Sequence, residues 1–415
     1  MRVLMVADFY EPYVGGVEQH VRSLSHALCE RGHDVAVATT ATDRAPTGVW
    51  ADGPVEVHRI ATTTARFGRL HAAADRPWAP PVPDPEASRH LRRLLRAWRP
   101  DVVHGHDWLA RSVAPWCRGG RPPMVTTQHY YTRSCARKDL WRLDRRCPGP
   151  SLRRCLACSA ATYGVAASVP VTLGTRAGAW IEDRWSAATV AVSDATATGN
   201  RTPPGHSVVP NLLPPDRALE DDPAVVLAAA GVPDTDFAVF IGDLRPTKGF
   251  QTLLAALARL DDPPPLVVVG ERDRSSPGTL PDGVHHLGTV DNALIVPLLA
   301  RARFGVIPSV WAEPFGIVAI EAMRAGTAVV ASDTGGLGEL VDDGVTGVLV
   351  PPGDVDALAQ AIDRLWDDPA TTDAMGRAGA VAADRYTPER VAPLIETVYE
   401  TAVARTRSST RRASG

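Results

Sequence analysis

The sequence predicts an α/β protein built from two doubly wound domains, each with a mostly parallel sheet. The chain has 415 residues, more than one hydrophobic core usually supports. In both halves, short apolar segments alternate with helix-like segments, which is typical of consecutive βαβ units. The Pro- and Asp-rich stretch VVPNLLPPDRALEDDP separates the halves and has the composition of a linker.

The first half opens with one βαβ unit. An apolar run over 3–7 leads through the turn-rich DFYEPYVGG into a helical segment over 17–31, and a strand covers 34–39. The strand-like segments DVVHGHD and MVTTQH follow later. The repeated order of strand, helix and strand predicts a parallel sheet.

A basic, Leu-rich helix over 88–98 precedes DVVHGHD. Its apolar face consists of Leu91, Leu94, Leu95 and Trp98. This face could lie on an anionic membrane, but a helix that precedes a parallel strand must cover the sheet. We therefore expect it to pack on the core.

The second half contains five predicted strands separated by helical stretches: FAVFIG, PLVVVG, FGVIPS, TAVVAS and TGVLV. We place the first domain over 1–212, with a Cys-rich insertion over 135–158, and the second domain over 213–385. A final helix covers 386–404. Residues 405–415, RTRSSTRRASG, have almost no apolar side chain and are expected to be disordered.

Composition indicates a globular protein, with 45% hydrophobic and 22% charged residues. No run of about 18 apolar residues occurs, and a strand follows Met1 directly, so we expect a cytoplasmic protein without a signal peptide. The net charge is −3, yet residues 86–154 hold 16 Arg or Lys and only 5 Asp or Glu. Such a patch could attract an anionic acceptor or the inner membrane face, or could simply face water. We expect no nucleic-acid partner, and membrane association that is at most peripheral.

Two carboxylates eight residues apart mark the segment EPFGIVAIEAMRAG. Pro314 and Gly316 delay the helix, so Glu313 is expected in a loop and Glu321 inside the helix. The N–H groups of Phe315, Gly316 and Ile317 would then lie at the positive end of a helix, which suits a diphosphate. Glu313 would meet sugar hydroxyls and Glu321 a ribose.

This segment, with VIPS before it and GTAVVASDTGG after it, resembles the Glu-x7-Glu signature of retaining family 4 glycosyltransferases. The resemblance extends from about Arg2 to about Tyr399. It implies the GT-B fold, in which two facing Rossmann-like domains enclose an interdomain cleft and the final helix packs back on the first domain. It also implies that Glu313 contacts the donor sugar and Glu321 the ribose.

The loop GDLRPTKG follows the first strand of the second domain and carries Lys248. An ammonium at this place can stabilise the charge that grows on a departing diphosphate. The family pattern has Arg directly after the first Gly, where this chain has Asp243. Arg245 stands two residues further on and is expected to supply the missing guanidinium.

His129 ends an apolar strand at the edge where open α/β sheets bind ligands. The resemblance suggests that it bonds the donor sugar or a phosphate. His104 and His106 end the preceding strand and could line the acceptor side or serve as structural hydrogen-bond partners. Gly15 and Gly16 precede the first helix, where bare backbone can approach a ligand, or form a plain turn.

Four further positions resemble family positions for which we expect no direct catalytic role. Val290 lies in the segment where the family binds the nucleotide base, mostly through backbone. Ser193, Asp194 and Asn211 are expected to shape turns and the hinge.

Four of the six cysteines fall within one short stretch of the first domain, at Cys135, Cys147, Cys155 and Cys158. Structural disulfides are not expected in a cytosolic protein, and a Cys-x2-Cys pair with two further thiols can bind tetrahedral Zn²⁺. The four residues could equally be reduced, metal-free thiols. Cys29 and Cys117 are isolated and are expected to be packing residues.

These observations favour a retaining glycosyltransferase that moves a hexose from a UDP- or GDP-sugar to a hydroxyl of a glycan, lipid-linked or small-molecule acceptor. No metal is needed at the donor. A nicotinamide-dependent enzyme is disfavoured, because neither half has Gly-x-Gly-x-x-Gly after its first strand. A sugar-nucleotide 2-epimerase and an inactive sugar-nucleotide-binding protein are the alternatives. The base, the sugar, the acceptor and the oligomeric state are not fixed by the sequence.

Overall fold

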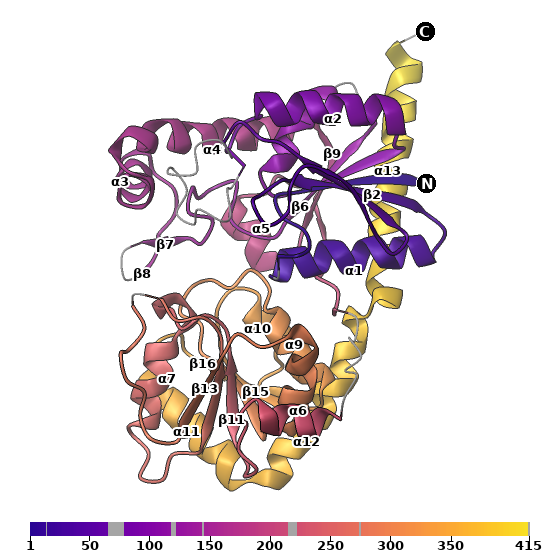
Figure 1. Cartoon of the computed structure of the whole chain (residues 1–415). Coiled ribbons are helices and arrows are strands. Elements are labelled where there is room, and N and C mark those ends of the chain that lie inside the picture. Colours follow the sequence, from indigo (N-terminus) through magenta and orange to yellow (C-terminus); the bar gives the residue numbers. More distant parts are fainter. Residues whose placement is uncertain are drawn as a thin grey trace. The chain divides into compact units, whose positions relative to one another are not determined.

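The computed structural model describes residues 1–13, 15–64, 79–117, 122–142, 145–214, 222–273 and 275–413. The chain divides into two compact units: unit 1 comprises Met1–Leu212 with Pro388–Gly415, and unit 2 comprises Leu213–Thr387. Part of the expected linker, 215–221, lies outside the described residues. Each unit is an α/β layer structure around a largely parallel sheet, so the predicted fold class is confirmed (Figure 1).

The sheet of unit 1 has eight strands in the order β10-β9-β6-β5-β1-β2-β4-β3. Neighbouring strands are parallel except β3, which runs antiparallel to β4. The strands are β1 (Arg2–Ala7), β2 (Asp34–Thr40), β3 (Gly48–Asp52), β4 (Val55–Ile60), β5 (Val102–His106), β6 (Met124–Gln128), β9 (Ser186–Ala191) and β10 (Ser207–Val208). Because β1, β5 and β6 are parallel neighbours, their carboxyl ends share one edge, where side chains that follow them meet.

Helices cover both faces of this sheet (Figure 1). They are α1 (Gly16–Glu30), α2 (Pro85–Trp98), α3 (Leu152–Tyr163), α4 (Val165–Trp185), α5 (Asp194–Asn200) and α13 (Pro388–Ala413), with the 3-10 turns η2 (Leu109–Ser112) and η3 (Ala114–Trp116). Asp84 starts α2 by accepting hydrogen bonds from the N–H groups of Glu86 and Ala87. Leu91 of α2 is fully buried, and Leu94 packs on the same core, as predicted for a helix that covers the sheet.

Helix α13 belongs to unit 1 although it ends the chain. It contributes Val391, Ile395, Val398 and Tyr399 to the same core as β1 and α1. The structure continues this helix to Ala413, so the expectation of disorder from residue 405 is wrong for 405–413. Arg and Ala are good helix formers, and no Gly or Pro interrupts the segment before Gly415, so low hydrophobicity alone was a poor guide. Residues 414–415 lie outside the described part.

The sheet of unit 2 has six parallel strands in the order β13-β12-β11-β14-β15-β16. They are β11 (Ala238–Ile241), β12 (Leu266–Val269), β13 (Val284–Gly288), β14 (Phe304–Ile307), β15 (Ala328–Ser332) and β16 (Gly347–Val350). The sequence predicted five of them. It missed β13, an edge strand whose sequence VHHLG is half-exposed and lacks the apolar run of a central strand.

The helices of unit 2 connect these strands (Figure 1). They are α6 (Pro223–Ala229), α7 (Phe250–Leu257), α8 (Ile295–Arg301), α9 (Ile317–Arg324), α10 (Leu337–Leu340), α11 (Val355–Asp367) and α12 (Pro369–Ala383), with the 3-10 turns η4 (Pro246–Lys248), η5 (Asn292–Leu294) and η6 (Asp384–Tyr386). Among the described residues, no helix has the length and apolarity to cross a membrane.

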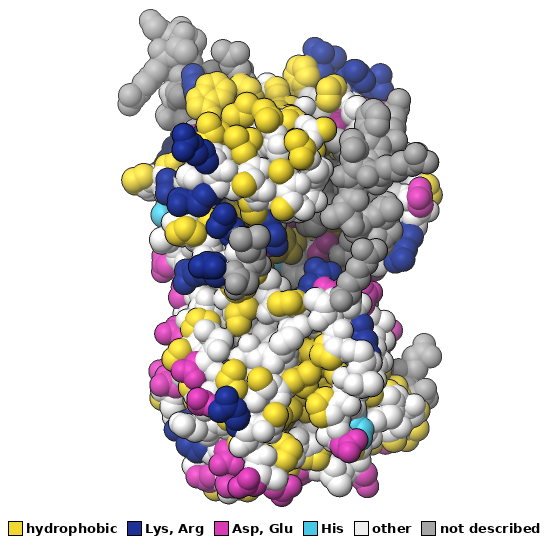
Figure 2. All heavy atoms as spheres, turned by 90° about the vertical axis from the view of Figure 1, so that its left-hand side faces the viewer, with side chains coloured by type: hydrophobic (Ala, Val, Ile, Leu, Met, Phe, Trp, Pro, Cys, Tyr) yellow, Lys and Arg dark blue, Asp and Glu magenta, His cyan; other side chains and the backbone are white. Residues whose placement is uncertain are grey.

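The Cys-rich insertion of unit 1 forms a two-stranded ribbon, β7 (Trp141–Arg142) with β8 (Arg145–Arg146), followed by the helical pair α3 and α4. An ordinary surface helix buries its apolar face and exposes its polar face, but in α4 the two faces are exchanged. Apart from Ile181, its buried side is small or polar and consists of Ser168, Thr172, Gly174, Thr175, Gly178 and Glu182. Its exposed side carries Val165, Val169, Leu173 and Trp180. Figure 2 looks onto this part of unit 1, where hydrophobic side chains gather beside Lys and Arg.

A buried ion-pair network holds the end of α4 in place. The carboxylate of Glu182 accepts from Arg111 Nε at 2.7 Å and from Arg133 at 3.1 Å. Arg111 is fully buried and also donates to the carbonyl oxygen of Pro81. A Cβ at Gly178 would stand 2.2 Å from Arg111 Nη1, so the helix approaches the guanidinium through a glycine. The orientation of α4 is therefore fixed by partners on its polar side.

Candidate donor-binding site

Glu313 lies in the loop before α9 and Glu321 lies inside this helix, as the sequence predicted. The helix begins after Gly316, whose φ of +114° is one that glycine adopts without strain. A Cβ at Gly316 would stand 2.5 Å from Cδ2 of Leu337, so the turn has no space for a larger residue. The first N–H groups of a helix have no partner within it, which makes the segment from Phe315 to Ile317 a positive end that suits an anion.

Lys248 and Glu313 meet in unit 2. The Lys248 ammonium lies 3.0 Å from each carboxylate oxygen of Glu313. The same carboxylate accepts hydrogen bonds from Trp311 Nε1 at 2.8 Å and from Ser309 Oγ at 3.1 Å. The Lys248 side chain remains 34% exposed, against 12% for Glu313. The acid is thus fixed by three donors, while the ammonium keeps one side available to a ligand.

The two loops meet because β11 and β14 are adjacent parallel strands. Lys248 lies in the turn after β11, and Glu313 lies in the loop after β14. Gly249 ends the first turn with φ +74°, and a Cβ there would stand 1.7 Å from the carbonyl oxygen of Pro308. Only glycine allows the backbone of one loop to lie this close to the other.

Glu321 is buried within α9. Burial raises the pKa of its carboxyl group to about 7, although the charge of Arg324 acts in the opposite direction. Near neutral pH the group is therefore a mixture of acid and carboxylate, which can donate to or accept from a hydroxyl. This chemistry fits a ribose better than a phosphate, whose oxygens only accept.

Arg245 does not lie on Glu313 but forms ion pairs with two other acids. Its guanidinium is 3.3 Å from Asp243 and 3.6 Å from Asp273, and the side chain is 55% exposed. Asp243 thus neutralises the arginine that was expected to replace the family's own. Exposed pairs of this kind are weak, so Arg245 can exchange these partners for an anion at little cost.

Val290 and Phe315 occupy different kinds of position. Val290 follows the edge strand β13 and is half-buried. The Phe315 side chain is buried, and its ring lies 5.7 Å from that of Tyr386, edge to face. Phe315 therefore offers a ligand its backbone N–H rather than its ring.

In unit 1, His129 lies directly after β6 and is buried with His106 of β5 and His20 of α1. His106 Nδ1 and His129 Nε2 share a hydrogen bond of 2.9 Å. Burial lowers the pKa of His129 to about 3, so the ring is neutral at pH 7. Within the described part of the chain, these three residues are the one set of three His, Cys, Asp or Glu whose ligand atoms all lie within 4.8 Å of one another.

His104 has a structural place. Its Nδ1 bonds the hydroxyl of Tyr399 in α13 at 2.7 Å, and its Nε2 bonds Thr127 at 2.6 Å. Burial lowers its pKa to about 3. His20 was not among the predicted site residues, although its position beside Val17, Val21 and Leu24 on the apolar face of α1 could have indicated that it faces the sheet.

Gly15 and Gly16 stand at the start of α1. Gly15 is extended, with φ −176°, a conformation open to any residue, and the nearest atom to a Cβ there would be the carboxylate of Glu18. Asn211 is buried near the end of unit 1. Ser193 caps α5 by accepting from the N–H of Thr196 at 3.0 Å, and Asp194 lies in the first turn of that helix. These last two positions have the expected structural form.

Asp8 and Lys138 were missed. Asp8 follows β1 and accepts from the N–H of Leu109 at 2.6 Å, while Lys138 lies 3.3 Å from its other oxygen. The Lys138 ammonium is also 4.5 Å from the centre of the Trp108 ring, and both charged residues are buried. The position of Asp8 after a predicted strand could have identified it. Lys138 gave no such signal, because the fold of the insertion decides where it lies.

The four cysteines of the insertion line one pocket of unit 1. Cys29 is half-buried against the core, and Cys117 is buried within it, as expected for packing residues.

Comparison with known families gives matches to both halves of the chain. Residues 14–211 match "Glycosyltransferase Family 4", and residues 229–381 match "Glycosyl transferases group 1".

Individual proteins are similar over nearly the whole chain. A glycogen synthase of Mycobacterium tuberculosis is 32% identical over 91% of this chain and 89% of its own length. A phosphatidyl-myo-inositol mannosyltransferase of Mycobacterium leprae is 29% identical over 97% of both chains. Among solved structures, the sucrose-phosphate synthase of Thermosynechococcus elongatus superposes with a TM-score of 0.71 at 22% identity, covering 97% of this chain and all of that one.

Proposed function

Because the chain belongs to glycosyltransferase family 4, with a group 1 glycosyl transferase domain, we propose that it moves a hexose from a nucleoside-diphosphate sugar to an acceptor hydroxyl through Lys248, Glu313 and Glu321. It is a retaining hexosyltransferase with the GT-B fold that takes its sugar from a nucleotide sugar. The observation that carries the proposed site is the ammonium of Lys248 at 3.0 Å from Glu313, in a loop beside the start of α9.

The cationic groups of the site are proposed to stabilise the departing nucleoside diphosphate. As the bond between the sugar C1 and the diphosphate oxygen breaks, negative charge grows on the β-phosphate. Lys248, Arg245 and the N–H groups from Phe315 to Ile317 stabilise that charge. Electrostatic stabilisation of this kind is usually the largest catalytic contribution in such a site. With these groups present, no metal is required at the donor diphosphate.

The acceptor hydroxyl attacks C1 on the face that the diphosphate leaves, so the configuration is retained. Its proton passes to the departing phosphate oxygen, and no enzyme carboxylate becomes covalently bound. Glu313 accepts from the hydroxyls of the donor sugar, and His129 is proposed to bond the sugar as a neutral donor or acceptor. Glu321 holds the ribose, Val290 offers backbone to the base, and Gly15 and Gly16 present N–H groups to donor or acceptor.

Nucleotide release tests the assignment. The purified chain should release nucleoside diphosphate from one of the UDP-, GDP- or ADP-hexoses, and that sugar should also raise its melting temperature. Lys248→Ala and Glu321→Ala should strongly lower release, whereas Arg259→Ala, which removes an exposed pair with Asp356, should not. Interconversion of sugar epimers without an acceptor would indicate the 2-epimerase instead, and a thermal shift without any release would indicate a binding protein.

We also propose that the acceptor is presented at an anionic lipid surface, which the outer face of α4 contacts. This face carries four large apolar side chains, Val165, Val169, Leu173 and Trp180. Arg153, Arg154, Arg176 and Arg184 are exposed on α3 and α4, against one exposed acid, Asp183. Apolar side chains flanked by arginines match a bilayer with anionic headgroups. A relative from Mycobacterium leprae is named a phosphatidyl-myo-inositol mannosyltransferase.

Vesicle flotation tests this second part. The chain should float with phosphatidylglycerol vesicles and stay behind with phosphatidylcholine alone. The double variant Val169→Glu, Leu173→Glu should lose flotation, while Val381→Glu, at a 79% exposed valine of unit 2, should keep it. Absence of flotation, or a stable dimer in solution that the double variant disrupts, would assign this face to something other than lipid.

A further inference from the structure

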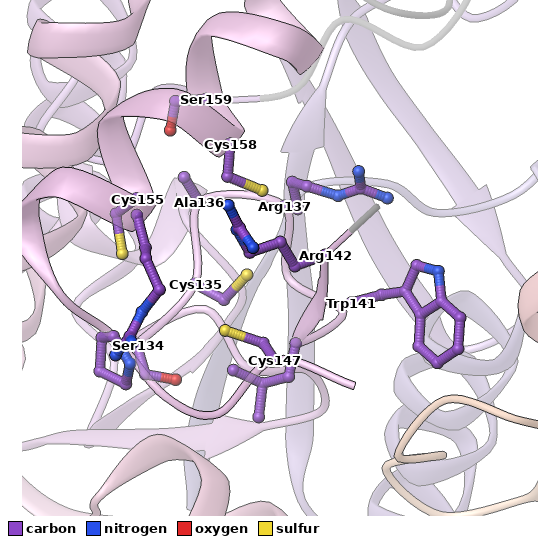
Figure 3. Close-up of a pocket in the computed structure, with 13 residues that line it drawn as sticks. Ser134, Cys135, Ala136, Arg137, Trp141, Arg142, Cys147, Cys155, Cys158 and Ser159 are labelled. Atoms are coloured by element: carbon purple, nitrogen blue, oxygen red, sulfur yellow. The ribbon is translucent and has the colours of Figure 1, made fainter. Parts of the chain in front are cut away.

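Three separate segments of unit 1 bring four thiols to one pocket (Figure 3). Cys135 lies after β6, Cys147 follows β8, and Cys155 and Cys158 lie three residues apart on α3. All four are free and half-buried. Figure 3 shows Cys155 and Cys158 projecting from α3 toward the segments that carry Cys135 and Cys147.

The surroundings suit an anionic metal centre. Arg137, Arg142 and Arg154 line the same pocket, and one acid, Asp139, lies beside Cys135 and pairs with Arg137 at 2.9 Å. The three arginines therefore exceed this acid where four thiolates and one divalent ion would leave a net negative charge.

The insertion has little apolar packing of its own. Strands β7 and β8 have two residues each, and the twelve residues of α3 bury only Ser159. The buried apolar side chains of the described part of the insertion are Ala136, Leu140 and Trp141. A short helix gains most of its stability from an apolar face against a core, and α3 has no such face, although it packs on α4 through the hydrogen bond of 3.0 Å between Ser159 and Thr172. Small segments without a core commonly obtain stability from a structural metal.

We propose that Cys135, Cys147, Cys155 and Cys158 bind one structural Zn²⁺ through four thiolates. Tetrahedral four-sulfur coordination is typical of zinc, and a spacing of three residues places Cys155 and Cys158 on one face of the helix. Binding exchanges four thiol protons for one ion and involves no oxidation. Among the described residues, only His20, His106 and His129 form a set of three whose ligand atoms all lie within 4.8 Å of one another, so the cysteine side chains would have to rotate inward to bind one ion.

The ion would also fix a residue at the sheet edge. Lys138 follows Cys135 by three residues, and its N–H donates to the carbonyl oxygen of Cys135 at 3.1 Å. Its side chain reaches Asp8 at the end of β1. A metal bound to Cys135 therefore holds the turn that places this ammonium.

Metal analysis of the full-length protein tests the proposal. Elemental mass spectrometry of protein purified without chelator should find about one zinc per chain. Cys147→Ser and Cys158→Ser should each lower the zinc content several-fold, whereas Cys29→Ser and Cys117→Ser should leave it unchanged. Replacing zinc by Co²⁺ should give the intense absorption of thiolate-bound cobalt, and a chelator should lower the melting temperature of the wild type but not of Cys158→Ser.

Cys158→His is the control for misfolding of Cys158→Ser. Because histidine can also bind zinc, this variant should recover the zinc content that Cys158→Ser loses. Wild-type protein with no metal and no cobalt absorption would overturn the proposal. So would iron in place of zinc, or a mass two units lower per cysteine pair, which indicates disulfides. Zinc that survives the cysteine substitutions but disappears in His106→Ala would move the ion to the histidines.

Discussion

At the scale of single residues, the loss of Lys248 should lower the rate of catalysis far more than the stability of the fold. Glu313 has three donors, so removing one leaves it bonded to Trp311 and Ser309. The Lys248 side chain is one-third exposed, and its ammonium also lies 5.4 Å from the centre of the Trp311 ring. Lys248→Ala should lower kcat by about 10²- to 10³-fold, the usual loss for one electrostatic contact to a developing charge, with a much smaller effect on the melting temperature.

Steady-state kinetics with the best nucleotide sugar measures that loss, and Arg259→Ala is its control. A rise in KM with kcat unchanged would mean that Lys248 binds substrate and transition state equally, against the charge-stabilising role.

Glu321 links stability to pH. Its pKa is raised from the ordinary value of 4.5 to about 7, so between these values the folded chain holds a proton that the unfolded chain has released. Raising the pH through this window must lower stability, by at most about 3 kcal/mol. Glu321→Gln removes the effect. We expect it to melt at a higher temperature than wild type at pH 8, with a smaller difference at pH 4.5, while losing affinity for the donor.

Thermal unfolding at the two pH values checks this prediction. The control is Glu271→Gln, an exposed acid of unit 2, whose difference from wild type should not depend on pH. If Glu321→Gln shows the larger gain at pH 4.5, the carboxyl group is not the neutral, buried acid that its surroundings imply.

The sequence indicated Lys248 and Glu313 because each stands in a recognisable turn or loop, and Glu321 because it lies eight residues after Glu313 inside the helix. It could not indicate that Asp243 and Asp273 would hold Arg245, since Asp273 comes from the loop after another strand. Nor could it place Lys138 on Asp8, 130 residues away, because only the folded insertion brings them together. Contacts that depend on long-range packing carry no local pattern.

At the scale of elements, the strands were predictable where they are central and apolar. β11, β12, β14, β15 and β16 were all indicated by short apolar runs, while the edge strand β13 was not. The orientation of helix α4 was not predictable from its pattern. Periodicity alone would place its polar side toward water, but that side is buried, and its Glu182 pairs with Arg111 and Arg133. Pattern reasoning fails where a buried charge rather than a core decides the orientation.

Two glycines of unit 2 allow the cost of a left-handed backbone conformation to be distinguished from the cost of a steric clash with a neighbouring loop. Gly249 and Gly326 have nearly equal φ, +74° and +77°. A Cβ at Gly249 would collide with the carbonyl oxygen of Pro308, whereas within the described residues no atom lies within 4 Å of a Cβ at Gly326. Gly326→Ala should cost about 1–2 kcal/mol for the left-handed conformation alone. Gly249→Ala should cost more and also weaken donor binding, because it displaces the turn that carries Lys248.

Denaturant unfolding and donor titration of both variants measure the two effects. Equal losses of stability, with donor affinity unchanged in Gly249→Ala, would show that the contact between the loops after β11 and β14 does not position Lys248.

At the scale of the whole molecule, the chain returns to unit 1 after completing unit 2. Val391, Ile395, Val398 and Tyr399 of α13 are almost completely buried in the core of unit 1, and Tyr399 bonds His104 there. Burying four such side chains contributes about 6–12 kcal/mol, which is comparable to the whole stability of a typical domain. Unit 1 should therefore not fold without α13, although 175 residues separate the helix from the rest of the unit.

Two truncations distinguish this role from that of the exposed end of the helix. A chain that ends at Ala404 keeps all four of these side chains and should melt at the wild-type temperature. A chain that ends at Thr387 should lose the unfolding transition of unit 1 while unit 2, which holds Lys248, Glu313 and Glu321, still unfolds cooperatively and responds to the donor. Calorimetry resolves the two transitions. Since unit 2 contains its own complete sheet and core, a donor response that vanished with α13 would contradict the proposal that Lys248, Glu313 and Glu321 bind the nucleotide within unit 2.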